Sequence, residues 1–214
     1  MSDKSNKYGY VGVDIPAQSF GSNKGVFNPA EINELVADNK WTTVGELELI
    51  ETQTFSGVST VDFTSIQEST YNVHFLTLSD IEHTSANSTT RIQYYESGVL
   101  ETASVYQYAL QSGDAGGSFA ETKSTGNTII FLSYNNNGTA TGDLESGYVY
   151  FYNLGDSAKY SFNTQQIVFQ DNGLFRMDFG SGVLPQTSTV NGIRLDFGGA
   201  STNGTASLYG IRYS

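Results

Sequence analysis

Alternation of apolar and polar residues runs through most of this chain. In the run 71–78, Val73 and Phe75 share one side, while His74 and Leu76 share the other. A repeat of two residues indicates a β-strand, because successive side chains of a strand point to opposite faces. Both sides of this run carry apolar or aromatic residues, so we expect both faces of its sheet to be covered. Similar runs predict strands at residues 46–55, 58–66, 91–95, 103–110, 128–134, 147–152, 158–169, 173–179, 193–197 and 206–213.

The closing residues carry this pattern twice. Leu195 and Phe197 alternate with Arg194 and Asp196, a Gly-rich turn follows, and a second run covers residues 206–213. The end of a chain is poorly ordered unless something holds it. We therefore expect the last run to be a paired strand that the domain needs.

Turn sequences separate these runs, among them Ser112–Gly117 and Asn135–Gly138. The chain of 214 residues contains 23 Gly, 13% aromatic and only 15% charged residues, a composition that favours β-strands joined by polar turns. Short strands at this spacing are typical of a sandwich or jelly roll. The fold class predicted is all-β: a jelly-roll-like β-sandwich over residues 44–214, preceded by an extended N-terminal arm and one short helix within residues 1–43.

Residues 28–41 have the pattern of a short amphipathic helix. An Asn-Pro pair opens the segment, which suits a helix cap and first turn. Ile32, Leu35 and Val36 fall on one side, and Trp41 ends the segment. A helix this short is not stable alone in water, so its apolar face must dock. Its own β domain and a partner chain both remain open as the docking site.

The first 25 residues are punctuated by Gly and show no clear period. They fit either an extended segment laid along a partner or a disordered one. If the arm and helix attach the protein to a partner, their apolar residues make the contacts. The predicted docking residues are Tyr8, Tyr10, Phe27, Ile32, Leu35, Val36 and Trp41.

Charge and segment hydropathy exclude several classes of partner. The formal net charge is −12, so the surface repels phosphate backbones and anionic lipid, and no nucleic-acid partner is expected. No run approaches 18 apolar residues, and the first residues lack the apolar core of a secretory signal. We expect neither membrane insertion nor secretion by a signal peptide. There is no cysteine, which excludes disulfides and thiolate sites.

Candidate catalytic and metal-ligating residues are few and scattered. His74 and His83 are nine residues apart without a zinc-ligand spacing, and we predict that His74 is packed and His83 lies on the surface. Calcium stays open, because the turns around Asp114, Asp143 and Asp156 could supply oxygen ligands, although they lack the dense pattern of a calcium loop. No nucleophile elbow or phosphate-binding loop is present, so neither catalysis nor a cofactor is predicted. Candidate carboxylates for a glycan hydrolase, whose separation the sequence does not give, are Asp62, Glu68, Asp80, Glu82, Glu96, Glu101, Asp143 and Glu145.

Tyrosines gather in the middle of the chain. In the pair Tyr94-Tyr95 the two side chains point to opposite faces, so one of them can be exposed. We expect alternate tyrosines to fill the sandwich core, with the hydroxyl at its edge. Tyr95 and Tyr134 are the predicted surface-recognition residues, since a tyrosine beside a polar turn can stack on a sugar ring or a protein partner.

Several phrases resemble a β-sandwich domain of virion proteins from tailed bacteriophages of the marine and cyanophage-like kind. The phrases occur in the same order over some 160 residues: 59–66, 71–81, 147–154, 191–195 and 204–211. The segment Gly25–Trp41 is similar to a second phage element, a Gly-aromatic lead followed by a short helix and a Trp. Phe27 stands here where Trp or Tyr is usual, and Thr42 stands where Pro often follows.

The resemblance implies a non-enzymatic protein mounted on the phage particle, most simply a tail fibre or tail accessory protein for host attachment. It implies virion partners contacted through the N-terminal arm, and assembly onto the particle in the host cytoplasm. A homo-oligomer such as a trimer is expected because a short arm binds more tightly when several copies act together. A host surface glycan or protein would then be the receptor. A capsid decoration protein and a lectin-like glycan-binding module are the alternatives, and no catalytic residue is carried over.

Overall fold

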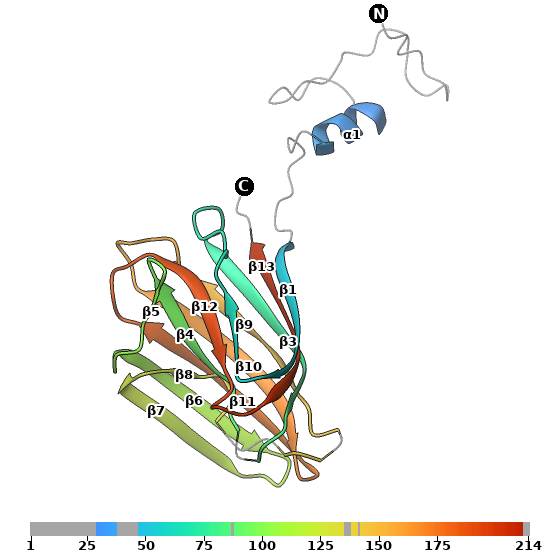
Figure 1. Ribbon diagram of the computed structural model, residues 1–214, viewed down its shortest axis with the longest axis vertical. Helices are drawn as coiled ribbons and strands as arrows, with labels where there is room; N and C mark the ends of the chain where they lie inside the picture. Colours follow the sequence, from blue (N-terminus) through green and yellow to red (C-terminus); the bar gives the residue numbers. More distant parts are fainter. Residues whose placement is uncertain (1–28, 38–46, 87, 135–137, 141, 212–214) are drawn as a thin grey trace, which may run out of the picture. The chain divides into compact units, whose positions relative to one another are not determined.

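The computed structural model describes residues 29–37, 47–86, 88–134, 138–140 and 142–211. Within these residues there are one helix and thirteen strands (Figure 1), so the prediction of an all-β protein with one short helix is confirmed. The elements are α1 (Pro29–Ala37), β1 (Leu47–Val58), β2 (Thr60–Phe63), β3 (Val73–His83), β4 (Arg91–Glu96), β5 (Val99–Leu100), β6 (Tyr106–Asp114), β7 (Phe119–Asn127), β8 (Ile130–Phe131), β9 (Glu145–Tyr152), β10 (Ser161–Asp171), β11 (Leu174–Leu184), β12 (Val190–Asp196) and β13 (Thr202–Ile211).

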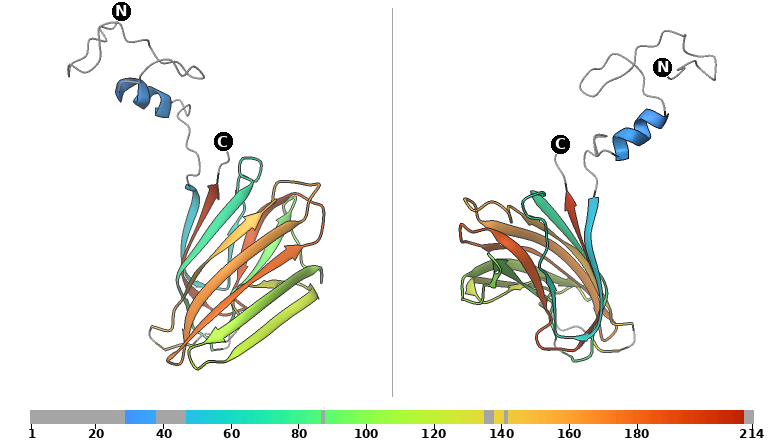
Figure 2. Two further views of the ribbon diagram at one scale, coloured as in Figure 1. Left: turned by 180° about the vertical axis from the view of Figure 1, so that it is seen from behind. Right: turned by 45° about the horizontal axis from the view of Figure 1, so that its top comes forward.

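The strands form two antiparallel sheets. The large sheet has the order β1-β13-β3-β9-β10-β11-β6-β7, and the small sheet has the order β2-β12-β4-β5 with β8 paired to β4. The view from behind in Figure 2 faces the large sheet. Strands β1, β3, β9 and β13 lie in the large sheet, whereas β2, β4, β8 and β12 lie in the small one. This alternation between two sheets is the wrapping of a jelly roll, which β10, β11, β6 and β7 extend on one side.

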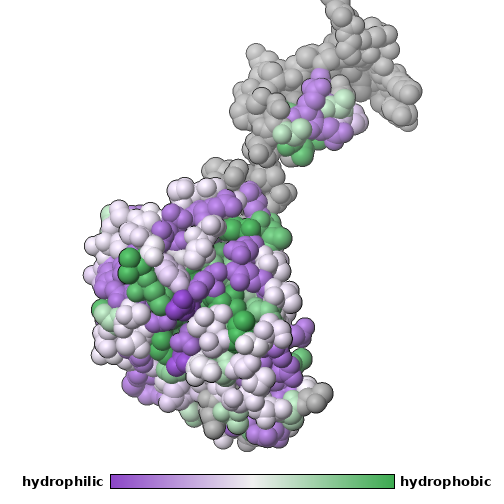
Figure 3. Space-filling model, in the orientation of Figure 1, coloured by the Kyte–Doolittle hydropathy of each residue, from purple (hydrophilic) through white to green (hydrophobic). Residues whose placement is uncertain are grey.

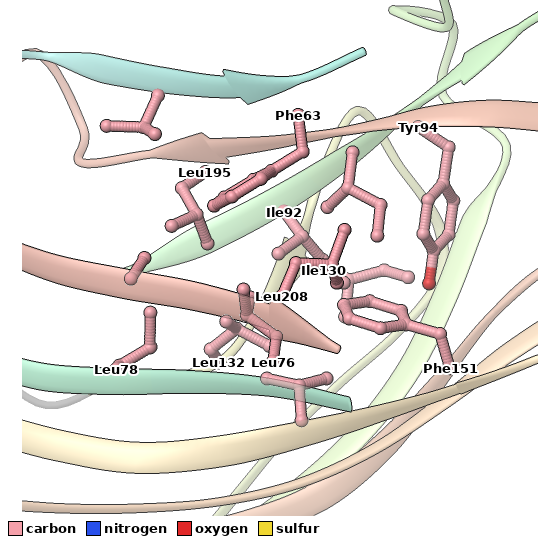
Figure 4. Close-up of a cluster of buried hydrophobic side chains, with 14 of the residues drawn as sticks. Phe63, Leu76, Leu78, Ile92, Tyr94, Ile130, Leu132, Phe151, Leu195 and Leu208 are labelled. Atoms are coloured by element: carbon pink, nitrogen blue, oxygen red, sulfur yellow. The ribbon is translucent and has the colours of Figure 1, made fainter. Parts of the chain in front are cut away.

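The core lies between the two sheets and is built by the inward side of each alternating strand. In Figure 4 the side chains of Phe63, Ile92 and Leu195 from the small sheet point toward Leu76 and Leu208 from the large sheet. All five are fully buried. Burying a side chain of this size contributes about 1.5–3 kcal/mol. The predicted alternation is therefore the pattern that assembles the sandwich.

The closing strand β13 lies inside the large sheet rather than at its edge. It pairs with β1 on one side and with β3 on the other, so that Leu208 is opposite both Glu51 and Leu76. Ala206 and Leu208 have no exposed surface. The prediction of a paired last strand is confirmed.

A bulge in β3 decides which of its later residues face the core. The pairing with β9 shifts between Leu78 and Ile81, and Asp80 has a φ of 54°. Because the bulge adds a residue, the β3 side chains that face the core have even residue numbers before it and odd numbers after it. Ile81 and His83 are therefore buried. The prediction that His83 lies on the surface is wrong for this reason.

Helix α1 covers Pro29–Ala37 of the predicted range 28–41, whose other residues lie outside those described. On its predicted apolar side Ile32 and Leu35 are half-buried, while Val36 is 54% exposed. The chain divides into two units between Val44 and Gly45, with α1 in the first and the sandwich in the second. The predicted docking residues outside the described part are Tyr8, Tyr10, Phe27 and Trp41, and their role stays a prediction.

We predict that deletion of residues 208–214 abolishes folding, because it removes the last four of the ten residues of β13, the strand that joins β1 to β3. The graded variant Leu208→Ala should lower the free energy of unfolding by about 2–5 kcal/mol, the cost of a large-to-small change in a core. Ser207→Ala, on the opposite face of the same strand, should cost less than about 1 kcal/mol. Denaturant unfolding measures all three, and a truncated chain that unfolds like the full chain would refute the prediction.

Candidate functional site

The alternation that builds the core also sends a second set of side chains outward from the large sheet. In β9 the residues Val149 and Phe151 are buried, so Tyr148, Tyr150 and Tyr152 point away from the core. We use the term outer face for the outward side chains of this sheet from β1 to β6, without the bulged end of β3, where Asp80 and Glu82 are exposed. They are Leu47, Leu49, Thr52, Thr54, Thr205, Ser207, Tyr209, Ile211, Val73, Phe75, Thr77, Ser79, Ser146, Tyr148, Tyr150, Tyr152, Phe162, Thr164, Gln166, Val168, Phe175, Met177, Phe179, Ser181, Val183, Gln107, Ala109 and Gln111.

Aromatic rings form a connected group on the outer face. The ring of Phe75 lies 4.7 Å from that of Tyr150, 6.0 Å from that of Tyr148 and 6.2 Å from that of Tyr209, measured between centroids. Strand register produces this group, since Phe75 is opposite Tyr150 on one side and Tyr209 on the other. The hydroxyl of Tyr148 donates to Oε1 of Gln166 at 3.1 Å, which holds the group to β10. The aromatic group is thus a fixed part of the sheet.

Much of this apolar surface is open to solvent. Leu49 is 59% exposed, Phe162 43%, Phe175 46%, Phe179 42% and Tyr148 38%. Single exposed apolar residues are ordinary, but a contiguous group of them marks a binding surface. The expectation that both faces of this sheet are covered is confirmed for the inner face. No described residue covers these five outward side chains fully.

The outer face so defined holds no charged side chain, although the chain as a whole carries −12. Charge begins at the bulged end of β3, where Glu82 is exposed and accepts a hydrogen bond of 3.0 Å from Nδ2 of Asn203. Charged pairs lie instead on the outward side of the small sheet, where Arg194 binds Asp62 through two bonds of 2.7 and 2.9 Å and Arg91 binds Asp196 at 3.2 Å. On the side of the molecule shown in Figure 3, hydrophobic residues form separate patches among hydrophilic ones. The outward side of the small sheet therefore carries ion pairs, whereas the outer face of the large sheet does not.

A shallow groove crosses the outer face where small residues line up. Thr164, Ser181 and Ala109 are opposite one another in register across β10, β11 and β6. The open groove beside them has a volume of about 680 Å³, and Phe162 and Lys123 are among the residues that line it. Larger side chains on both sides of a small-residue row produce this hollow.

The two predicted recognition tyrosines lie apart from the outer face. Tyr95 is half-buried on the small sheet, where its hydroxyl accepts a bond of 2.8 Å from Arg194, whose guanidinium lies 5.6 Å from the ring centroid. Burial raises the pKa of the Tyr95 hydroxyl, and its hydrogen bond to Asp62 raises it further. Tyr134 follows β8, is 44% exposed and packs edge-on against Phe131 at 5.0 Å. The structure does not bring these two residues together.

The expectation that alternate tyrosines fill the core holds for one part of the chain only. Tyr94 and Tyr106 are fully buried, and the hydroxyl of Tyr106 accepts a bond of 2.9 Å from the backbone N–H of Tyr94. Tyr148, Tyr150 and Tyr152 point outward instead, because Val149 and Phe151 take the inward positions. In the sequence Tyr-Val-Tyr-Phe-Tyr, either the tyrosines or the residues between them could face the core, and the alternation alone does not decide which.

A buried polar cluster contains the residue types of a hydrolase triad in a different arrangement. Nε2 of His83 lies 3.7 Å from Oε2 of Glu145, while its Nδ1 contacts Oγ1 of Thr202 at 3.0 Å. The hydroxyl of Ser133 donates to Glu145 at 2.9 Å and not to the histidine. A triad requires a serine-to-histidine bond and access for a substrate. All of these side chains are buried, so the cluster ties β3, β9 and β13 together.

Glu96 and Glu101, two of the candidate carboxylates, do not have the spacing for glycoside hydrolysis. Burial raises the pKa of Glu96, which also hydrogen-bonds Glu101 and Ser188. The backbone amide of Ala103 lowers the pKa of Glu101. Hydrolysis of a glycoside requires two carboxylates about 5–9.5 Å apart, whereas these two are in direct contact. The structure thus supplies no reason to assign them to catalysis.

The described residues contain neither a metal-ligand cluster nor a membrane-spanning helix. No group of three His, Asp or Glu residues there could hold a metal ion. No helix in the described part of the chain is both long and apolar enough to cross a membrane.

No protein-family model matches this chain, and no curated protein sequence is significantly similar to it.

We predict that acid destabilises the fold through His74. Burial lowers the pKa of this fully buried histidine below 6.5, against the opposing effect of its 2.8 Å hydrogen bond to the carbonyl of Ile66. The folded state therefore binds fewer protons than the unfolded state, so stability is complete above pH 6.5 and falls as the pH drops below it.

His74→Gln keeps a donor for the Ile66 carbonyl and cannot titrate. Urea unfolding at pH 7 and pH 5.5 should show a smaller loss of stability for this variant than for the natural chain. An equal loss in both proteins would show that His74 is not the group responsible.

Proposed function

We propose that this chain is a non-enzymatic structural protein of a tailed-bacteriophage particle. In this proposal residues 1–43 attach it to other virion proteins, and the sandwich is displayed for assembly and host attachment, as in a tail fibre or tail accessory protein. A capsid decoration protein would use the same parts. The role is one of binding and assembly rather than of chemical conversion.

The uncharged aromatic outer face is the observation that carries this proposal. Interface cores are depleted of charge and enriched in Tyr and Phe, and the outer face shares both features, with Thr, Ser and Gln between its aromatic residues. Tyr148, Phe162 and Phe179 supply large contact areas with few rotatable bonds. A protein that binds through a broad sheet face has no need of a reactive pocket.

The chemistry of the remaining clusters supports the same proposal. The serine, histidine and glutamate that could resemble a catalytic group are sealed inside the core. The exposed arginines are already paired with carboxylates on the small sheet. The phage-like phrases of the sequence fall on elements of the sandwich, with 191–195 in β12 and 204–211 in β13. These phrases therefore belong to the framework of the fold.

A lectin-like function is the second candidate, and the open groove favours it. A neutral sugar chain could lie against Phe162 while Gln107 and Ser181 bind its hydroxyl groups, because aromatic rings and amides are common partners of sugars. The groove faces the same side of the sheet as the aromatic group. Both candidates are binding functions and differ in the partner.

We predict that the protein is a stoichiometric component of purified phage particles. Quantitative mass spectrometry should find it at a fixed number of copies per particle after gradient purification. Immuno-electron microscopy should place it at one structural location, such as the tail or the capsid surface. A phage enzyme that stays in the cell serves as the control for carry-over, and finding this chain only in the soluble host fraction would refute the proposal.

A further inference from the structure

We infer that the outer face of the large sheet binds a second copy of this chain. The inference rests on the assembly role proposed above and adds the identity of a partner for its surface. The sheet carries large apolar side chains on both sides, as sheets that are covered on both sides do. One side is covered by the small sheet, while Leu49, Tyr148, Phe162 and Phe179 on the other remain 38–59% exposed.

Charge favours contact between two copies through the outer face rather than through other surfaces of the protein. Two chains that each carry −12 repel one another wherever carboxylates face carboxylates. The outer face holds no charged side chain short of the bulged end of β3, where Glu82 is bound by Asn203, so two copies can meet over the rest of the face without that cost. The nearest charges on the neighbouring strand β7, Glu121 and Lys123, already form a pair at 2.5 Å.

The size of the outer face suits an interface between proteins. Strands lie about 4.8 Å apart and outward residues repeat about every 6.7 Å along a strand, so the face covers roughly 30 by 20 Å. This is about 600 Å² in plan and more when protruding rings are included, against about 600–1,000 Å² per partner in stable complexes. The face is therefore large enough to hold two copies together.

A second copy also covers more of the exposed apolar residues than a sugar bound in the groove does. The groove beside Phe162 covers only β10, β11, β6 and β7. The exposed Leu49 and the aromatic group around Phe75 lie on β1, β3, β9 and β13, outside that groove. A partner with a flat apolar surface of the same extent covers both regions, and the outer face of another copy is such a surface.

The test is the mass of the full chain in solution. Multi-angle light scattering and sedimentation over a range of concentrations should give a multiple of 23.2 kDa that falls toward the monomer on dilution. Phe179→Glu places a negative charge within the outer face and should raise the dissociation constant at least tenfold. Val99→Glu is the matched control, because Val99 is 71% exposed on β5 of the small sheet and should leave association unchanged.

A second measurement keeps the inference testable if Phe179→Glu fails to fold. The chain has no cysteine, so Gln166→Cys and Val99→Cys each introduce a single reactive thiol. A short bis-maleimide should join two copies through Gln166→Cys and not through Val99→Cys.

Three results would overturn the inference: a natural chain that is monomeric at 100 µM or above, association that Phe179→Glu leaves intact, or equal cross-linking at both positions. A monomer that binds a neutral polysaccharide would identify the groove as the site instead. Each of these results leaves the proposed presence on phage particles untouched, because that proposal is decided by particle composition.

Discussion

The pairing of β13 between β1 and β3 is the interaction on which the rest of the structure depends. It is made by residues at the end of the sequence with strands formed much earlier, so it closes the large sheet over the longest separation in the chain. Its inward residues Ala206 and Leu208 complete the core, and its outward Tyr209 completes the aromatic group around Phe75. The pairing of β13 with β1 and β3 therefore contributes side chains to both the core and the outer face.

The same sheet is apolar toward its partner sheet and carries large apolar side chains among uncharged polar ones toward solvent. A sandwich normally buries one side of each sheet and leaves polar residues on the other. The small sheet follows this rule, with Asp62, Arg91, Arg194 and Asp196 facing outward. The large sheet departs from it over seven strands, and a departure of this extent points to contact with another molecule. Binding is thus the function for which the fold supplies a surface.

Sequence periodicity predicted the strands whose inner sides fill the core, including the closing strand. It missed β7, because the residues Phe119–Asn127 are mostly polar and exposed, and an edge strand needs no buried side. It also misplaced His83, since the bulge at Asp80 changes the inward set of β3 through backbone geometry that composition does not reveal. Local pattern therefore identifies strands better than it identifies the face on which each residue lies.

The outer face could be anticipated only in part. Apolar residues on both sides of the run 71–78 indicated a sheet that is covered on both faces. The alternation in β9 did not reveal which of its aromatic residues face the core. Long-range register assembled Phe75, Tyr148, Tyr150 and Tyr209 into one group. Tyr95 and Tyr134 had favourable local contexts for recognition, yet Arg194 holds Tyr95 on the small sheet. Pairing between distant strands, which no local pattern contains, built the candidate surface.

Solvent footprinting of the tyrosines tests most directly whether the outer face is the contact surface. Tyr148 on that face is 38% exposed and Tyr134 away from it is 44% exposed, so hydroxyl radicals should modify them at similar rates in the isolated chain. Mass spectrometry of the concentrated protein should show Tyr148 protected and Tyr134 still modified, with the difference lost on dilution. Equal modification of both tyrosines at every concentration would contradict the account.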